Sequence, residues 1–550
     1  RTVEFREMVQ ALNQKGLRVV MDVVYNHTNS SGQNAQSVLD RIVPGYYHRL
    51  SDDGNVETST CCQNTASENA MMEKLLIDSV VTWARAYKVD GFRFDLMGHH
   101  LKSNMVKLRA TLDALTVEKD GVDGKAIYVY GEGWDFGEVA ANARGINATQ
   151  ANMAGTGIGT FNDRLRDGAR GGGPFSGLQE QGFISGLLSA PNGTNQGTEV
   201  DLKNKLLTYG DWIRVGLTGN LKDYVLQDRT GAQVTGSQVV YNGAPAGYTL
   251  DPQEVITYVS AHDNETLFDA VQLKAPRDLA MAERVRMHNL GLSLVALGQG
   301  IPFFHAGDEL LRSKSLDRNS FNSGDWFNKL DWTYQSNNWG VGLPPAPENT
   351  ANWPLFGPML ADPALKPASA DIVRARDHFE EMLAIRKSSR LFRLRTGDEV
   401  KQLVHFENTG PDQIAGLIVM AMQDHGTNAE GKRAIVLFNG TDDAQTFKAD
   451  AYKTLKLKLH PLQQASTDPV VRTSAYDAAT GGFTVPARTT AVFVTDDATD
   501  PTDPTDPTDP TDPDDDSDGC GCQSTVPGPL GATGLLLAVG LMLKLRRRRA

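Results

Sequence analysis

The chain has 550 residues, of which 40% are hydrophobic and 22% charged, and its formal net charge at pH 7 is −13. This length and composition are typical of a globular protein with more than one domain and a large core. A mildly acidic chain without a basic stripe argues against nucleic acid as a partner.

Predicted helices and strands alternate from residue 1 to about residue 365. Helices are expected at residues 5–16, 68–88 and 278–299, and strands at residues 17–27, 89–96, 126–134, 254–264 and 301–309. Strands separated by helices indicate a parallel sheet with crossover helices. Residues 140–250 fit this alternation poorly, and we interpret them as a long insertion that lines a substrate cleft.

Every predicted strand in this part ends in polar residues. They are Asn26 and His27, Asp95, Glu132, His262 and Asp263, and Asp308 and Glu309. In a closed (β/α) barrel the carboxyl ends of all strands lie around one rim, and the active sites of barrel enzymes are found there. The expected fold class is therefore α/β, with a (β/α)8 TIM barrel as the catalytic domain over residues 1–365.

A different pattern begins near residue 366. Short β-type runs split by turn residues predict an antiparallel β-sandwich domain over residues 366–495. Residues 496–518 hold eleven aspartates, five of them in a Thr-Asp-Pro repeat, and form a predicted extended linker. Residues 519–550 combine a Gly-Cys motif, a short apolar run and four arginines. They predict a transmembrane-like helix with a cytoplasmic arginine end, and the alternative is a disordered basic tail.

The four cysteines form two close pairs, Cys61-Cys62 and Cys520-x-Cys522. Metal sites need ligands that are more widely spaced than these. The adjacent pair is expected to form a vicinal disulfide if the protein is exported, and two buried thiols are the alternative.

The stretch Asp90–His100 places a cation and an anion on the same face of a predicted strand. Because side chains alternate along a strand, Phe92 and Phe94 point one way, and Arg93 and Asp95 point the other. The arginine favours the ionised carboxylate, which is the form that a covalent nucleophile needs. A buried salt bridge without chemistry is the alternative interpretation.

A second carboxyl group, Glu132, ends another strand and is followed by Trp134. A carboxyl group beside an indole is partly desolvated, which raises its pKa and suits a general acid. Asp263, with His262 beside it, and His27 could bond to sugar hydroxyls in the transition state. Glycoside hydrolysis needs at least two carboxyl groups, one that is ionised and one with a raised pKa that holds a proton.

The stretches DVVYNH, GFRFDLMGHH, GEGWD and VSAHDNE resemble the four successive motifs of glycoside hydrolase family 13, the α-amylase family. The resemblance implies that Asp95 is the nucleophile, Glu132 the acid/base and Asp263 the transition-state stabiliser. It also implies that His27, Arg93 and His262 contact substrate and that Asp22 braces the arginine.

Flanking stretches such as STCCQNTASEN and GARGGGPF resemble type I pullulanases, the α-1,6 debranching enzymes. The resemblance covers residues 1 to about 495 and implies retaining hydrolysis of pullulan, amylopectin and limit dextrins, with Trp134 in the aglycone site. An α-1,4-acting amylase or neopullulanase and a non-catalytic surface α-glucan-binding protein are the alternatives.

The resemblance carries three further expectations. The first two barrel strands of the family are absent, so the barrel is expected to be incomplete at its N-terminus. A structural calcium ion is a candidate cofactor near Asn26, although hydrogen bonding of that side chain within the rim is favoured. The tail resembles myxobacterial sorting signals, which implies export and display at the cell surface.

Overall fold

The computed structural model describes residues 1–424 and 432–495, which belong to one compact unit. The predicted linker at residues 496–518 and the tail at residues 519–550, with Cys520 and Cys522, lie outside the described residues. None of the helices that the structure describes is long and apolar enough to cross a membrane.

Six parallel strands form the central sheet, in the order β1-β4-β5-β6-β11-β12. They are β1 (Val20–Val23), β4 (Gly91–Phe94), β5 (Tyr128–Gly131), β6 (Gly159–Phe161), β11 (Val255–Thr257) and β12 (Ile301–Pro302). The predicted alternation and parallel sheet are confirmed, in a form consistent with part of a TIM barrel. Within the described residues, β1 and β12 each pair on one side only.

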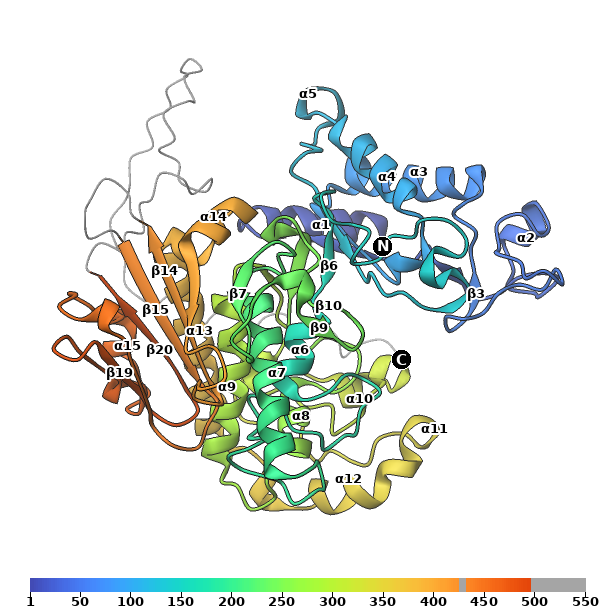
Figure 1. The fold of residues 1–550 in the computed structure, drawn as a ribbon. Helices are drawn as coiled ribbons and strands as arrows, with labels where there is room; N and C mark the ends of the chain where they lie inside the picture. The colour runs from blue at the N-terminus through green and yellow to red at the C-terminus, as the bar shows by residue number, and fades with distance from the viewer. Residues whose placement is uncertain (425–431, 496–550) are drawn as a thin grey trace, which may run out of the picture. The chain divides into compact units, whose positions relative to one another are not determined.

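Helices connect these strands (Figure 1). The longer ones are α1 (Thr2–Asn13), α3 (Ala70–Tyr87), α4 (Lys102–Asp113), α6 (Asp163–Arg170), α7 (Glu199–Leu217), α8 (Leu267–Lys274), α9 (Met281–Leu297) and α12 (Trp353–Leu360). Single-turn helices are α2 (Leu39–Ile42), α5 (Val117–Asp120), α10 (Asp325–Asn328) and α11 (Ala346–Asn349). Small antiparallel ladders join β2 (His27–Thr28) to β3 (Gln63–Asn64), β7 (Val225–Gln227) to β8 (Gln233–Thr235), and β9 (Val240–Tyr241) to β10 (Ala244–Pro245).

The two faces of β4 have different environments, as its alternation predicts. Phe92 and Phe94 are fully buried in a cluster with apolar residues of α3 and α4. The apolar residues of α3 recur at helical spacing, and the helix ends where Lys88 takes a left-handed conformation and bonds back to Ala84. Arg93 is thereby left on the opposite face of the strand.

That opposite face of the sheet is filled by aromatic residues. Tyr130, Phe161, Ile256 and Tyr258, from β5, β6, β11 and the residue that follows it, form one buried cluster. The guanidinium of Arg93 lies over the ring of Phe161, at 5.9 Å from its centroid. The sheet therefore carries a packed apolar layer beneath its polar carboxyl ends.

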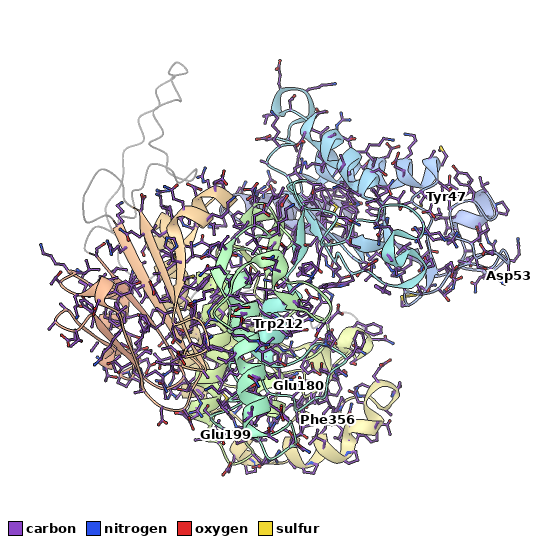
Figure 2. The ribbon with its side chains drawn as sticks, viewed as in Figure 1. Tyr47, Asp53, Glu180, Glu199, Trp212 and Phe356 are labelled. Atoms are coloured by element: carbon purple, nitrogen blue, oxygen red, sulfur yellow. A yellow bond between two sulfur atoms is a disulfide. The ribbon has the colours of Figure 1, made fainter. Side chains whose placement is uncertain are left out.

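The interpretation of residues 140–250 as a single insertion was wrong. This segment contributes β6, which lies between β5 and β11, together with α6 and α7. In α7 the indole N–H of Trp212 donates to the carbonyl of Val240 at 2.8 Å, and the indole packs against Tyr241 (Figure 2). The strand escaped prediction because its sequence, Gly-Thr-Phe, has only one large apolar residue and forms no apolar run.

The C-terminal part is a pair of antiparallel sheets, as predicted. One has the order β13-β14-β15-β20-β17 and the other β16-β19-β18 (Figure 1). Their strands are β13 (Val404–Glu407), β14 (Leu417–Asp424), β15 (Lys432–Asn439), β16 (Gln445–Lys448), β17 (Lys458–Leu459), β18 (Ala475–Asp477), β19 (Gly482–Val485) and β20 (Thr489–Val494). Helices α13 (Ser369–Ser388) and α14 (Gly397–Leu403) precede them, and α15 (Pro461–Gln464) lies between β17 and β18. The domain boundary at residue 366 stays a prediction.

The central strands of the larger sheet are buried on both faces. In β14, Leu417 and Val419 belong to the core between the two sheets, whereas Ile418 and Met420 belong to the core shared with α7 and α9. Strands β15 and β20 alternate in the same way, and both contact α9. The sandwich and the helices around the parallel sheet therefore share one continuous core.

Truncating Phe438, a fully buried residue of that shared core, tests this arrangement. Phe438→Ala should lower the free energy of unfolding by about 3–5 kcal/mol, because it removes apolar contacts and leaves a cavity. Phe175→Ala, made at a fully exposed phenylalanine, should change it by less than about 0.5 kcal/mol. Chemical denaturation measures both, and equal effects would contradict the shared core.

Candidate active site

Arg93 is the centre of a charge cluster at the carboxyl ends of three neighbouring strands. Its Nη1 lies 2.9 Å from Asp22 and 3.1 Å from Asp95, and its Nη2 lies 2.8 Å from Glu132. The register of the sheet brings these side chains together, because β1 pairs Asp22 with Arg93 and β5 lies on the other side of β4. Burial by itself lowers the pKa of Arg93, but the attraction of the three carboxylates is larger, so the pKa is raised.

Glu132 is the more deeply buried of the two carboxyl groups predicted to react. It is 8% exposed, and its Oε2 accepts a hydrogen bond from the backbone N–H of Leu96 at 2.8 Å. Burial raises the pKa of Glu132 to about 7, against the opposing effect of Arg93, and the negative charges of Asp95 and Asp263 raise it further. The carboxyl group is thus able to hold a proton near neutral pH.

Trp134 is partly buried just beyond the end of β5. Its side chain packs against the aromatic cluster of Tyr130 and Phe161, and burial at the strand end as a whole raises the pKa of Glu132. Gly131 allows the end of β5 to lie close to β4, since a Cβ there would lie 2.6 Å from the carbonyl of Phe94. The predicted contact of Trp134 with substrate stays a prediction.

Asp263 and His262 lie on the loop that follows β11, where both side chains are more than half exposed. The nearest carboxylate oxygen of Asp263 lies 3.6 Å from Nε2 of His262. The loop brings Asp263 close enough to Glu132 for its charge to raise the pKa of the glutamate. The structure therefore brings the three predicted acids into one electrostatic site.

The loop is held by Glu265, which the sequence analysis did not single out. Glu265 is buried and forms ion pairs with Arg170 and Arg318. Arg318 also donates to the carbonyl of Pro174, so a single arginine joins the loop of Asp263 to two other segments. The acid follows Asp263 in the HDNE stretch, but its partners are distant in sequence and no local signal marks them.

His27 enters the site through the short ladder of β2 and β3. Burial lowers the pKa of its imidazole, and the charge of Asp95 opposes this effect. Its Nδ1 lies 2.9 Å from the amide nitrogen of Asn26, and its Nε2 lies 3.5 Å from Sγ of Cys61. Cys61 and Cys62 form the expected vicinal disulfide.

The surroundings of Asn26 do not fit a calcium site. Calcium takes oxygen ligands, and usually several carboxylates. In the part of the chain that the structure describes, the one group of three acidic, histidine or cysteine side chains with converging ligand atoms is His27, Cys61 and Cys62. These offer nitrogen and sulfur, so a structural calcium ion stays a prediction without a supporting site.

The raised pKa of Glu132 can be measured directly. Its carboxyl carbon should titrate near pH 7 in nuclear magnetic resonance spectra of glutamate-labelled protein. Asp263→Asn should lower this midpoint, because it removes a negative charge that disfavours ionisation. Asp53→Asn, at an exposed turn residue, is the matched control and should leave the midpoint unchanged. A midpoint near the ordinary glutamate value of about 4.3 would contradict the description of the site.

Comparison with known proteins identifies relatives of this chain. Residues 334–496 match the family described as alpha-1,6-glucosidases, pullulanase-type, C-terminal. Pullulanase 1, chloroplastic, of Arabidopsis thaliana is 53% identical over 504 residues, which are 90% of this chain and 52% of that protein. Pullulanase of Klebsiella pneumoniae is 42% identical over 504 residues, which are 90% of this chain and 45% of that protein.

Solved structures agree with these matches. The maltotriose complex of PulA from Klebsiella pneumoniae superimposes with a TM-score of 0.82 at 41% identity, over 89% of this chain and 52% of that one. The chain thus spans about half the length of the curated relatives that it matches. Nine-tenths of its length is similar to pullulanases, and its residues 334–496 match the family described as alpha-1,6-glucosidases, pullulanase-type, C-terminal.

Proposed function

We propose that the chain carries the catalytic site of a pullulanase-type debranching enzyme, which hydrolyses α-1,6-glucosidic bonds in pullulan, amylopectin and limit dextrins with retention. The observation that carries the proposal is the shared guanidinium of Arg93, which holds Asp95 and Glu132 at 3.1 Å and 2.8 Å. Retaining glycosidases need two carboxyl groups close together, one ionised and one protonated. The pullulanase relatives support the choice of bond and substrate.

In the first step Asp95 attacks the anomeric carbon while Glu132 donates its proton to the leaving glycosidic oxygen. Arg93 stabilises the carboxylate of Asp95, and burial keeps Glu132 protonated near neutral pH. The glycosyl group becomes an ester of Asp95, and the aglycone leaves with the proton of Glu132.

The first step changes the charge of Asp95, and this prepares Glu132 for the second step. Esterification removes the negative charge of Asp95, which had raised the pKa of Glu132. Arg93 then interacts with one carboxylate fewer and favours ionised Glu132 more strongly. Glu132 is thereby converted into a base that takes a proton from water, and the hydroxide releases the sugar from Asp95.

The remaining predicted residues are assigned to substrate. Asp263 lies near enough to Glu132, and His27 to Asp95, for their charges to interact. With His262 they would offer hydrogen-bonding groups to sugar hydroxyls, which strengthens binding in the transition state. Trp134 is assigned to the aglycone side. Support for an α-glucan comes from the related PulA, whose structure was solved with maltotriose.

We further propose that the protein is exported and held at the cell surface by residues 519–550, with residues 496–518 as a spacer. The support is compositional: an aspartate-rich repeat is followed by an apolar run and by arginines that would stay on the cytoplasmic side.

Replacement of the two reacting carboxyl groups tests the catalytic assignment. Glu132→Gln should lower kcat on pullulan by about 10²–10⁴-fold, because it removes general acid–base catalysis. Asp95→Asn should abolish formation of the glycosyl-enzyme. Asp53→Asn, an exposed residue marked in Figure 2, should retain full activity. Equal turnover by Asp95→Asn and the unmodified protein would end the catalytic assignment of Asp95, and no turnover by either would favour the non-catalytic glucan-binding alternative. Maltotriose as the product from pullulan supports α-1,6 cleavage, whereas panose would identify an α-1,4-acting enzyme.

Arg318 holds the loop of Asp263 through its ion pair with Glu265, so its replacement should affect catalysis by displacing Asp263. Arg318→Gln removes the charge that pairs with Glu265, and we expect kcat/KM to fall about tenfold, or about 1.4 kcal/mol. Arg318→Lys should restore part of the loss, because it keeps the charge without the forked geometry. Arg472→Gln, at an exposed arginine, is the control. If Arg318→Gln lowers thermal stability but not kcat/KM, Arg318 has no positioning role.

A further inference from the structure

His27 and the two adjacent cysteines converge on one point. Nitrogen of His27 and the Sγ atoms of Cys61 and Cys62 all lie within 4.8 Å of one another. The ladder of β2 and β3 causes this, since it pairs His27 with Asn64 and the cysteines come immediately before β3. Residues 34 positions apart in sequence are therefore neighbours at the active site.

The backbone around these three side chains is firmly held. The N–H of Thr65 donates to the carbonyl of Asn26 at 2.9 Å, one step along the ladder. The side-chain amide of Asn64 donates to Ser59 and to Glu138, which anchors the segment on both sides of the cysteines. None of these contacts depends on the bond between the two sulfur atoms.

We propose that the reduced Cys61-Cys62 pair and His27 form a binding site for a soft divalent cation of the zinc or cadmium class. Two thiolates and one imidazole are the ligand types that such ions prefer, and a water molecule completes a tetrahedral site. Cys61 is exposed and Cys62 and His27 are partly exposed, so an ion can enter from solvent.

The chemistry begins with breakage of the disulfide. A phosphine reductant transfers two electrons to the sulfur atoms, and water supplies two protons to the thiols and its oxygen to the phosphine oxide. The cation then displaces both thiol protons as it forms two metal–sulfur bonds, so binding releases two protons. The oxidised pair has no thiolate to offer and does not bind the ion.

Asn26 is suited to support the histidine in this site. Its Oδ1 is buried without a hydrogen-bond partner, while its amide nitrogen lies 2.9 Å from Nδ1 of His27. A half-turn of the amide places the oxygen at Nδ1, where it accepts a hydrogen bond and leaves the lone pair of Nε2 for the metal. Ligating histidines usually have a partner of this kind at the other ring nitrogen.

Occupation of the site should inhibit the enzyme, an expectation that depends on the proposed function. His27 is a predicted substrate contact, and as a ligand it would be fixed away from the sugar. The cation would also lie near Asp95, whose charge acts on the His27 imidazole. A positive charge there stabilises the ground state of the nucleophile and opposes its attack.

The test uses Cd²⁺ with the full chain, reduced by a phosphine that is then removed. The pair Cys520 and Cys522 supplies a matched control, because it offers the same number of thiols elsewhere in the chain. In the Cys520→Ser/Cys522→Ser variant we expect one Cd²⁺ per chain by calorimetry, with the ultraviolet absorption of cadmium–thiolate bonds. Cys61→Ser/Cys62→Ser should lose this site, and the oxidised chain should lack it.

Further variants and an activity assay separate the two parts of the proposal. His27→Gln should weaken Cd²⁺ binding by at least the 10–100-fold that loss of a supporting group typically causes. Hydrolysis of pullulan by the reduced chain should fall with Cd²⁺ occupancy and recover with a chelator. Absence of the thiolate absorption, or unchanged affinity in His27→Gln, would overturn the site. Full occupancy without inhibition would overturn its effect on catalysis, whereas a chain inactive without metal would refute the proposed function alone.

Discussion

The site depends on one buried cation that is shared by three carboxylates. Arg93 reaches Asp22, Asp95 and Glu132 from a strand whose other face is packed against helices. Removing these charges from water is costly, and only close pairing offsets the cost. The cluster therefore requires that β1, β4 and β5 keep their register, because a shift of one residue would turn Arg93 to the face that packs against α3 and α4.

One guanidinium can support two opposite roles because the two acids differ in burial. The side chain of Asp95 is 24% exposed and that of Glu132 is 10% exposed. Water still solvates the first, whereas desolvation of the second outweighs its contact with the same cation. Burial at the strand end, rather than the identity of the charged partner, therefore accounts for the raised pKa of Glu132.

The sequence predicted the features that arise from local patterns. Alternation in β4 correctly separated Phe92 and Phe94 from Arg93, and the apolar runs located five of the six parallel strands. Strand β6 was missed because its sequence, Gly-Thr-Phe, forms no apolar run. The contact of Arg318 with Glu265 and the approach of His27 to Cys61 depend on tertiary structure, and no spacing rule predicts them. The pKa of Glu132 was predicted in direction, and burial at the strand end is its largest cause.

The shared core also has a consequence for the order in which the chain can fold during synthesis. Val492 and Val494 of β20, the last strand that the structure describes, pack into the same cluster as Leu292 and Leu294 of α9. A ribosome-bound chain that has already made the whole parallel sheet would still lack these side chains, and one surface of α9 would be open to solvent. The catalytic half is therefore expected to reach its native packing only after the final strand leaves the ribosome, in a single late step.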